Sequence, residues 1–177
     1  LLQFTRQMIR AATEKDLMDI LQIYNDAILH TTAVYDYNVH TIEERKQWYE
    51  KKKQEGYPLL VFEKNKRVAG FATFGPFRAW PAYKYTIEHS VYVHGDFRRE
   101  GIAIKLMQDL MKIANEREFV TLVAGIDAAN IGSIKLHEKL GFTFSGVIKK
   151  AGFKFDQWLD LAFYQLELSG PKAPTEG

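Results

Sequence analysis

"VHGDFRREGIAIKLMQDL", residues 93–110, is the stretch that decides the fold. It begins at the end of an apolar, β-branched run, passes through a turn with two arginines and continues as an amphipathic run from Ile102. In that run Ile102, Leu106 and Leu110 recur at the spacing of one helical face. A strand that leads directly into a helix, with Gly101 at the junction, is typical of layered domains that combine helices with a sheet.

The junction has the chemistry of an anion-binding site. The first turn of a helix has free backbone N–H groups and the positive end of the helix dipole. Gly101 and Ala103 leave that backbone unobstructed, and Arg98 and Arg99 add positive charge. A P-loop is excluded because Ile102 follows the glycine where lysine is required, and a dinucleotide fingerprint is excluded because it needs three glycines. The alternative interpretation is a helix cap flanked by two solvated arginines.

The composition is that of an ordinary globular protein: 46% of the 177 residues are hydrophobic, 26% are charged, and the formal net charge is +2. This charge is too small to indicate nucleic-acid binding, and no basic stripe with interleaved aromatic residues is present. The absence of cysteine excludes disulfides, thiolate metal sites and a cysteine nucleophile. No grouping of His, Asp and Glu has the spacing of a metal site. Without a membrane-spanning run or a signal-peptide pattern, we expect a cytoplasmic protein with no membrane or nucleic-acid partner.

Hydrophobic periodicity and turn signals predict the element order β-α-α-β-β-β-α-β-α-β-β. Capping residues start the first two helices at Thr13 and Thr41, Gly56 ends the second, and the other helices follow Gly101 and Asn130. The strands are expected at residues 8–12, 58–64, 67–75, 85–94, 119–126, 142–150 and 158–168. The fold class is therefore α/β (α+β), a single layered domain with a mixed central sheet. We expect the domain at 8–168, an N-terminal extension at 1–7 and a flexible C-terminal tail at 169–177.

Two motifs resemble those of the GCN5-related N-acetyltransferase (GNAT) superfamily. Residues 98–103, RREGIA, are similar to its acetyl-coenzyme A loop, Q/R-x-x-G-x-G/A. Residues 130–142, NIGSIKLHEKLGF, are similar to its next motif, N-x-x-S-x-x-(aromatic or His)-E-K-x-G-F. The motifs stand in the family order with a predicted strand between them. The resemblance implies a GNAT-like domain in which a splayed strand pair, flanked by helices, opens the sheet.

The resemblance also implies acetyl-CoA as co-substrate and no metal. The backbone of Val91, Tyr92 and Val93 would contact the acetyl and pantetheine arm, and the Val93 amide would polarise the thioester carbonyl. Asn130 would hydrogen-bond the pantetheine amides, and its alternative role is the N-cap of the following helix. The cofactor-binding set implied by the motifs further includes Arg98, Arg99, Glu100, Gly101, Ile102, Ala103 and Ser133.

A narrower resemblance lies in the segments IEHSVYV, LHEKLGF and GVIKKAGFKFDQWLDLAFYQLEL. They are similar to the phosphinothricin and methionine sulfoximine acetyltransferase branch of the superfamily. In that branch a glutamate on the strand before the loop is the proposed general base, which is Glu88 by position. Histidine stands where many relatives carry a tyrosine acid, so His137 is a candidate acid or substrate contact; its alternative is a packed helix residue. Relatives in this branch are commonly homodimers, and we expect a homodimer here.

The strand pattern around Glu88 indicates a position in a cleft. Alternation places Thr86, Glu88, Ser90 and Tyr92 on one, mostly polar face, whereas His89 points to the other face and is interpreted as structural. A carboxylate in such a cleft can take the proton of an attacking amine, directly or through a water. The alternative is a glutamate paired with a neighbouring lysine or arginine at the sheet surface.

The loop GPFRAWPAYKYT, residues 75–86, comes just before Glu88 and is the candidate acceptor site. Arg78 is the candidate bidentate partner for the carboxylate of an amino acid. The other candidate acceptor-binding residues are Tyr35, Phe77, Tyr83, Tyr85 and Thr86. The aromatic ones are alternatively core or dimer-interface residues, and for Trp80 an interface or packing role is favoured.

The sequence therefore predicts an N-acetyltransferase that moves acetyl from acetyl-CoA to the α-amine of a small amino-acid analogue. The analogues implied by the resemblance are phosphinothricin, methionine sulfoximine and methionine sulfone. The amine is expected to attack directly, with Glu88 as the base. The alternatives are an acetyltransferase for a protein N-terminus, a lysine or a polyamine, and a non-catalytic CoA-binding domain. An open acidic groove would favour a macromolecular acceptor, whereas the aromatic loop with Arg78 favours a small one.

Overall fold

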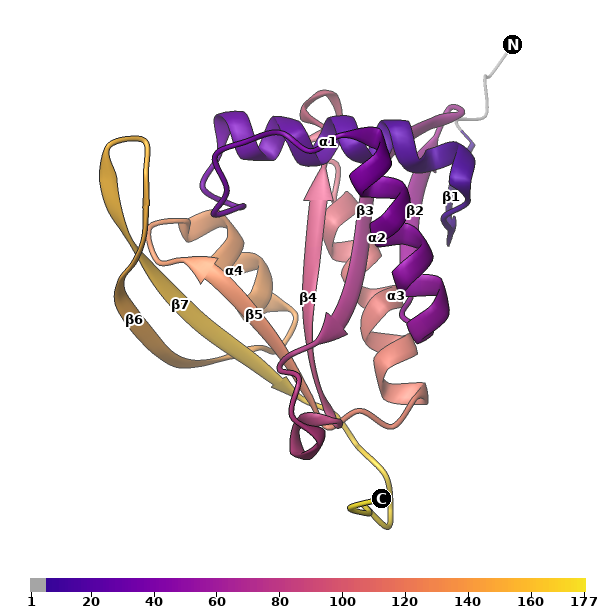
Figure 1. Ribbon diagram of the computed structural model, residues 1–177, viewed down its shortest axis with the longest axis vertical. Helices are drawn as coiled ribbons and strands as arrows, with labels where there is room; N and C mark the ends of the chain where they lie inside the picture. The colour runs from indigo at the N-terminus through magenta and orange to yellow at the C-terminus, as the bar shows by residue number, and fades with distance from the viewer. Residues whose placement is uncertain (1–5) are drawn as a thin grey trace.

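A seven-stranded mixed sheet with the strand order β1-β2-β3-β4-β5-β7-β6 runs through the molecule, and helices cover both of its faces (Figure 1). The computed structural model describes residues 6–177. The strands are β1 (Gln7–Ala11), β2 (Leu59–Lys64), β3 (Arg67–Pro76), β4 (Thr86–Val93), β5 (Thr121–Asp127), β6 (Thr143–Lys154) and β7 (Gln157–Glu167). The helices are α1 (Leu17–His30), α2 (Ile42–Glu55), α3 (Ile102–Glu116) and α4 (Ile131–Lys139), with short 3-10 turns at Glu14–Asp16, Pro81–Tyr83 and Gly95–Phe97. The predicted fold class and element order are confirmed.

Local signals in the sequence set the boundaries in the N-terminal half. Thr41 and Glu44 form a reciprocal capping box at the start of α2, with Thr41 N–H donating to the Glu44 carboxylate at 2.7 Å. Gly56 ends α2 in the left-handed conformation, with φ of +77°. Asn65 and Lys66 both have positive φ, as a two-residue turn between twisted antiparallel strands requires. These residues fix where α2 and the β2–β3 hairpin lie along the chain.

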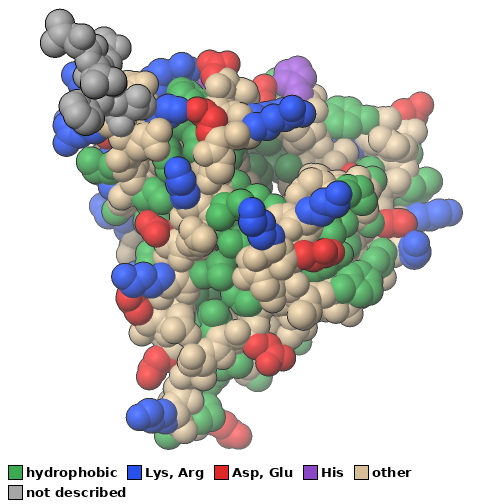
Figure 2. All heavy atoms as spheres, turned by 180° about the vertical axis from the view of Figure 1, so that it is seen from behind, with side chains coloured by type: hydrophobic (Ala, Val, Ile, Leu, Met, Phe, Trp, Pro, Cys, Tyr) green, Lys and Arg blue, Asp and Glu red, His purple; other side chains and the backbone are tan. Residues whose placement is uncertain are grey.

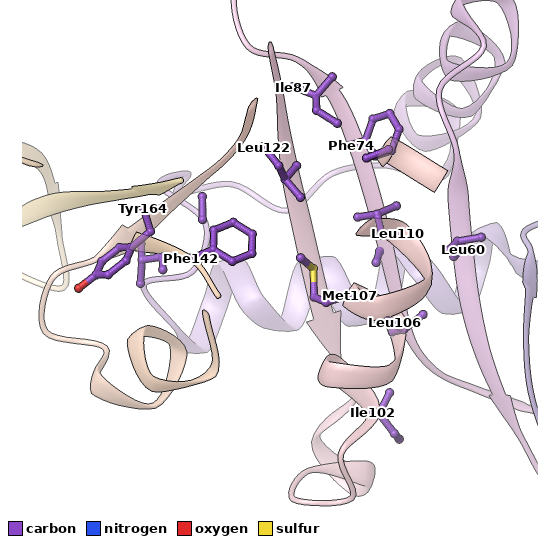
Figure 3. Close-up of a cluster of buried hydrophobic side chains, with 14 of the residues drawn as sticks. Leu60, Phe74, Ile87, Ile102, Leu106, Met107, Leu110, Leu122, Phe142 and Tyr164 are labelled. Atoms are coloured by element: carbon purple, nitrogen blue, oxygen red, sulfur yellow. The ribbon is translucent and has the colours of Figure 1, made fainter. Parts of the chain in front are cut away.

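The main core lies between α3 and the sheet, and Figure 3 shows the apolar stripe of α3 turned toward the strands. The buried members of the stripe are Ile102, Leu106, Met107, Leu110 and Ala114. Gly70 on β3 permits a close approach, since a Cβ there would lie 2.9 Å from Tyr92 O and 3.2 Å from Ile102 Cγ2. The first turn of α3 is therefore held against β3 and β4.

The opposite face of the sheet is covered by α1 and α2 (Figure 1). Leu17 and Ile20 of α1 pack against Val61 and Phe71 of the sheet. Burial of apolar side chains on both faces, at roughly 25 cal/mol per Å² of apolar surface, is the main stabilising term for such a layered domain. Packing on both faces of the sheet therefore holds β4 in place.

The sheet opens between β4 and β5. These strands are parallel and pair only from Thr86 to Glu88 on β4 and from Thr121 to Val123 on β5. Beyond Glu88 they diverge, which leaves the inner edge of the second half of β4 without a partner strand (Figure 1). The splayed strand pair implied by the motifs is present.

The last two strands form a long hairpin that projects beyond the rest of the sheet (Figure 1). β6 continues to Lys154 instead of ending at residue 150, and β7 begins one residue earlier than predicted, because Phe155 and Asp156 form a tight turn with φ of +51° and +61°. β6 is an edge strand, and its register shifts at Gly146 and Gly152 interrupt the alternation that sequence prediction relies on.

The first strand begins one residue earlier than predicted. Residues 1–5 of the expected extension lie outside the described residues, but Gln7 already belongs to β1 and pairs with Lys64. At the C-terminal end, residues 169–177 contain no helix or strand. Within residues 6–177 no helix has the length and apolar character that crossing a membrane requires.

Candidate active site

The opening between β4 and β5 contains a cavity of about 220 Å³, which we call the β4–β5 cavity. Its walls are residues 88–92 of β4, residues 124–127 of β5, the start of α4 and the loop after α1. Of the predicted site residues, the structure brings Glu88, Val91, Tyr92, Asn130, Ser133, His137 and Tyr35 together here.

The inner edge of β4 presents free backbone groups to this cavity. His94 donates its backbone N–H to Ala69 O on β3 at 2.8 Å, and residues two apart on a strand point the same way. The N–H groups of Val91 and Val93 therefore point away from β3, into the opening where β5 no longer pairs. An extended ligand can use such groups as an added strand would.

Glu88 lies at the last paired position, where the opening begins. Gly125 of β5 makes room for its carboxylate, since a Cβ at position 125 would lie 3.3 Å from Glu88 Oε1. Among residues 6–177 no ion pair holds this carboxylate, so the paired-surface alternative does not describe it. Burial raises the pKa of the Glu88 carboxyl, and the positive charge of Arg78 opposes the rise. A half-buried carboxylate without a structural partner has the properties of a general base.

The start of α3 has the open backbone that the glycine loop predicts. Gly101 caps the helix with φ of +74°, and a Cβ there would meet no atom within 4 Å. Arg99 also has a positive φ, of +63°, and Arg98 and Arg99 are exposed. The face that carries α3 and α4 is hollowed, with Lys and Arg side chains around the hollow (Figure 2). The N–H groups of the first turn are thus accessible to an anion.

Three other residues that were predicted to bind the cofactor have side chains that bond to or pack against other parts of the protein. Glu100 forms an ion pair with Lys64. Ile102 is 3% exposed and packs in the core, so only its backbone can face a ligand. Tyr92 packs its ring against Tyr24 and Phe71 at centroid distances of 5.6 and 5.2 Å, and burial raises its pKa to about 12. The side chains of Glu100 and Ile102 are thus engaged within the protein, whereas Tyr92 also lines the β4–β5 cavity.

Asn130 caps α4 in the way its alternative role predicts. Its side-chain Oδ1 accepts the backbone N–H of Ser133 at 3.1 Å. The amide nitrogen of the same side chain is not used in that bond, and Asn130 lines the β4–β5 cavity. Capping and ligand binding are therefore compatible at this residue.

His137 is buried and joined to His89, a pairing that the sequence did not predict. His137 Nδ1–H donates to Ser133 O at 2.7 Å, which leaves its Nε2 to accept from His89 Nε2–H at 2.9 Å. His89 Nδ1 is buried without a hydrogen-bond partner of good geometry among the described residues. Both rings thus carry one proton each and are neutral. Residues 6–177 contain no cluster of three His, Asp or Glu side chains placed for a metal ion.

This histidine pair makes folding stability depend on pH. Burial lowers the pKa of His89 to about 3, and it also lowers the pKa of His137, whereas both have a pKa near 6.5 when unfolded. As the pH falls, these histidines therefore bind protons in the unfolded chain before they do so in the folded protein. The free energy of unfolding is expected to fall as pH drops below about 6.5, by about 1.4 kcal/mol per pH unit for each histidine. Urea denaturation between pH 7 and pH 4 measures this slope. His89→Gln should flatten it, and the exposed His30→Gln should not; equal slopes in all three proteins would refute the assignment.

Two further cavities adjoin Glu88 and the loop before it. The first, the α2 cavity, has a volume of about 370 Å³ and lies between α2 and the face of β4 that carries Glu88, Ser90 and Tyr92. The second has a volume of about 470 Å³ and lies between residues 77–86 and strands β5 to β7. It brings together four of the predicted acceptor residues, Phe77, Arg78, Tyr83 and Thr86.

Tyr35 and Tyr85, the other two predicted acceptor residues, lie apart from that second cavity. Tyr35 lines the β4–β5 cavity, with its ring against Gly152 of the β6–β7 hairpin, where a Cβ would be 2.7 Å away. The Tyr85 hydroxyl accepts the backbone N–H of Thr175 at 3.0 Å, so this ring faces the C-terminal segment. The structure therefore does not bring Tyr85 to the predicted acceptor site.

The arrangement of splayed strands, open helix start and flanking helices is matched by a known family. The family model described as the acetyltransferase (GNAT) domain matches residues 9–163. The chain belongs to the GNAT acetyltransferase family. Its sequence is 42% identical to the L-methionine sulfoximine/L-methionine sulfone acetyltransferase of Salmonella typhimurium, over 94% of this chain and 97% of that protein.

Solved structures agree with this membership. The N-acetyltransferase of Staphylococcus aureus is 55% identical with a TM-score of 0.92, over 93% of this chain and 99% of that one. A GNAT phosphinothricin acetyltransferase of Sinorhizobium meliloti, solved with AcCoA, is 33% identical with a TM-score of 0.91, over 97% of this chain and 94% of that one. The resemblance to the phosphinothricin and methionine sulfoximine branch is thereby confirmed, and the protein is an acetyltransferase.

Two residues that shape this acetyltransferase site were not predicted from the sequence. Gly125 was part of an apolar strand, and nothing in that run shows that a carboxylate from another strand lies over it. Arg45 is 3% exposed although it stands in a helix rich in charged residues, where an exposed position is the ordinary expectation. A weak signal was available for Arg45, since Trp48 follows one turn later and an arginine can stack on it.

Proposed function

We propose that this enzyme transfers acetyl to the α-amine of a small amino-acid analogue of the methionine sulfoximine, methionine sulfone or phosphinothricin type. The acetyl donor is acetyl-CoA, as for other GNAT acetyltransferases. The observation that carries the proposal is the position of Glu88. Its partly buried carboxylate lies where the β4–β5 cavity meets the α2 cavity, so it faces both a donor site and an acceptor site.

The donor fits the open edge of β4 and the start of α3. The pyrophosphate would bind the first-turn N–H groups of α3 at residues 101–103, with Arg98 and Arg99 adding charge-assisted contacts. The pantetheine arm would extend along the free N–H groups of Val91 and Val93. Val91 lines the β4–β5 cavity and lies nearer to Glu88 than Val93 does, so the Val91 N–H, rather than the predicted Val93 N–H, would stabilise the thioester oxygen as it gains negative charge.

The chemistry requires the loss of two protons from the acceptor ammonium, a bond exchange at the acyl carbon and protonation of the departing thiolate. The ammonium loses a proton to the Glu88 carboxylate, and the freed amine forms a C–N bond with the thioester carbon. The C–S bond then breaks with its electron pair on sulfur, the second proton of the attacking nitrogen passes to solvent, and the CoA thiolate takes a proton from solvent to give the thiol. In this proposal His137 supports the cavity wall and does not act as the acid, because both of its ring nitrogens are bonded within the protein.

Arg78 is proposed to bind the acceptor carboxylate. Its positive charge acts on Glu88, it is exposed, and its guanidinium lies 5.1 Å from the ring of Phe77. Arg78→Ala is expected to raise the acceptor KM about 10-fold or more and to change kcat little, because a charge-assisted bidentate contact is lost. Steady-state kinetics measures this effect. Arg78→Lys should recover part of it, and Lys84→Ala in the same loop should leave KM unchanged; an unaltered KM in Arg78→Ala would refute the role.

The predicted homodimer is proposed to form through the projecting hairpin. Its exposed apolar residues are Phe144, Val147, Ile148, Phe153, Phe155 and Trp158. An edge strand with such a surface is a ready pairing site. Sedimentation equilibrium that shows a monomer at micromolar concentration would contradict this proposal. The cytoplasmic location stays a prediction of the composition.

An acceptor panel tests the proposed function. Release of CoA thiol is measured with methionine sulfoximine, methionine sulfone, phosphinothricin, a lysine peptide, an N-terminal peptide and spermidine. We expect thiol release and N-acetyl product, identified by mass spectrometry, with the small amino acids. Turnover of only the peptides or the polyamine would replace the proposed acceptor class, and binding of acetyl-CoA without any turnover would favour a non-catalytic domain.

A further inference from the structure

The α2 cavity contains a buried arginine whose charge has no carboxylate partner among residues 6–177. Arg45 is 3% exposed, and its guanidinium lies 4.2 Å from the ring centroid of Tyr24 and 4.5 Å from that of Trp48. Its terminal nitrogen donates to His40 Nδ1 at 3.2 Å, and its Nε has no hydrogen-bond partner in the described part of the chain. A buried cation held only by rings and a neutral acceptor is costly unless an anion joins it.

A second cation lies on the wall of the same cavity. Lys52, two turns further along α2, donates from Nζ to Phe74 O at 3.1 Å and lies 5.4 Å from the Trp48 ring. Burial lowers its pKa to about 8, and it has no ion pair with a described residue. Of the carboxylates nearby, Glu44 caps α2 and Asp36 bonds to His40, and Glu88, which also lines the cavity, forms no ion pair with Arg45 or Lys52.

The position of the cavity relative to Glu88 gives it a role in acceptor binding. Glu88, Ser90 and Thr73 form its sheet wall, and Arg45 and Lys52 lie on the helix side. An amino acid whose α-amine lies at Glu88 and whose carboxylate lies at Arg78 can place its side chain in the α2 cavity. The cavity volume of about 370 Å³ accommodates a side chain of several atoms.

We propose that the α2 cavity is the acceptor side-chain site, and that Arg45 and Lys52 select side chains ending in an anionic or oxygen-rich group. This inference rests on the proposed acetyl transfer to an amino acid. Phosphinates, sulfones and carboxylates supply oxygens that accept from guanidinium and ammonium donors. An apolar end of equal length leaves both cations without a partner, which is the basis of discrimination.

The kinetic test compares acceptors that differ at the end of the side chain. Lys52→Met keeps the apolar stem and removes the charge, and Lys51→Met, on the exposed side of α2, is the matched control. For Lys52→Met we expect kcat/KM to fall about 10-fold or more with phosphinothricin and to change less than about 2-fold with methionine. Equal losses with both acceptors, or no loss with phosphinothricin, would overturn the inference. Arg45→Lys provides a second variant that retains the charge but lacks the planar guanidinium. Its loss of kcat/KM should also be confined to phosphinothricin.

A binding test separates this inference from the proposed function. Trp48 borders the cavity, whereas Trp80 and Trp158 are 75% and 60% exposed, so Trp80→Phe and Trp158→Phe leave Trp48 as the fluorescent reporter. Titration with phosphinothricin, without acetyl-CoA, should give a saturable change whose affinity falls about 10-fold or more in Lys52→Met and not in Lys51→Met. A saturable fluorescence change that Lys52→Met weakens, without turnover of any amino acid, would uphold the site and refute the function. Turnover with no saturable change, or with a change that Lys52→Met leaves intact, would refute the site and uphold the function.

Discussion

Glu88→Gln is expected to lower kcat roughly 100- to 1,000-fold, the usual contribution of a positioned general base. Glutamine has nearly the same shape and fits above Gly125, but it cannot take the ammonium proton. Since the donor is proposed to bind through backbone N–H groups of β4 and α3, which this substitution leaves in place, the affinity for acetyl-CoA should stay the same. Steady-state thiol release gives kcat, and the thermal shift induced by acetyl-CoA reports donor binding.

The pH profile makes this test specific. Burial raises the pKa of Glu88, so the wild-type kcat/KM should rise with pH through an apparent pKa above that of an ordinary glutamate. This acid limb should disappear in Glu88→Gln. Glu116→Gln, an exposed glutamate at the end of α3, controls for loss of one negative charge. Normal turnover with an unchanged acid limb in Glu88→Gln would remove Glu88 as the base.

Gly101→Val is expected to weaken acetyl-CoA binding about 10-fold or more. A branched residue at φ of +74° costs roughly 1–2 kcal/mol, and relief of that strain turns the first-turn N–H groups of α3 away from the pyrophosphate. The added side chain also projects into space that the donor needs. Isothermal titration with CoA measures the change in affinity, and urea denaturation reports the accompanying loss of stability.

Gly95→Val is the matched control for this substitution. A Cβ at Gly95 also meets no atom within 4 Å, but Gly95 lacks the positive φ and does not cap α3. Its affinity for CoA should stay within about 2-fold of the wild type, because no anion-binding N–H group moves. Equal affinities in the two variants would show that the start of α3 does not bind the pyrophosphate.

Much of the fold follows from local chemistry that the sequence displays. The capping box of Thr41 and Glu44, the left-handed Gly56 and the helical stripe from Ile102 each depend on neighbours close in sequence. The same holds for the glycine loop, whose conformation at Gly101 is the one that a glycine permits most easily. These elements were placed within a few residues of their true bounds.

The parts of the site that escaped prediction depend on contacts between distant segments. His89 and His137 are 48 residues apart, and neither position shows in the sequence that the two rings meet. The alternation correctly predicted that His89 points to the face opposite Glu88, but it could not predict that the ring of His137 is its partner. Arg45 escaped because burial of a charged helix residue depends on which helices and strands enclose it. Tyr85 was grouped with the acceptor loop by its position in sequence, whereas its hydroxyl bonds to Thr175.

A crystal structure of the enzyme with CoA and methionine sulfone tests the central claim most directly. We expect the pantetheine arm to lie between residues 89–92 of β4 and 124–127 of β5, with the pyrophosphate at the start of α3. The acceptor α-amine should lie within about 3 Å of the Glu88 carboxylate or one water away, and about 3–4 Å from the CoA sulfur. An amine bound away from Glu88, or a CoA arm outside the β4–β5 cavity, would contradict it.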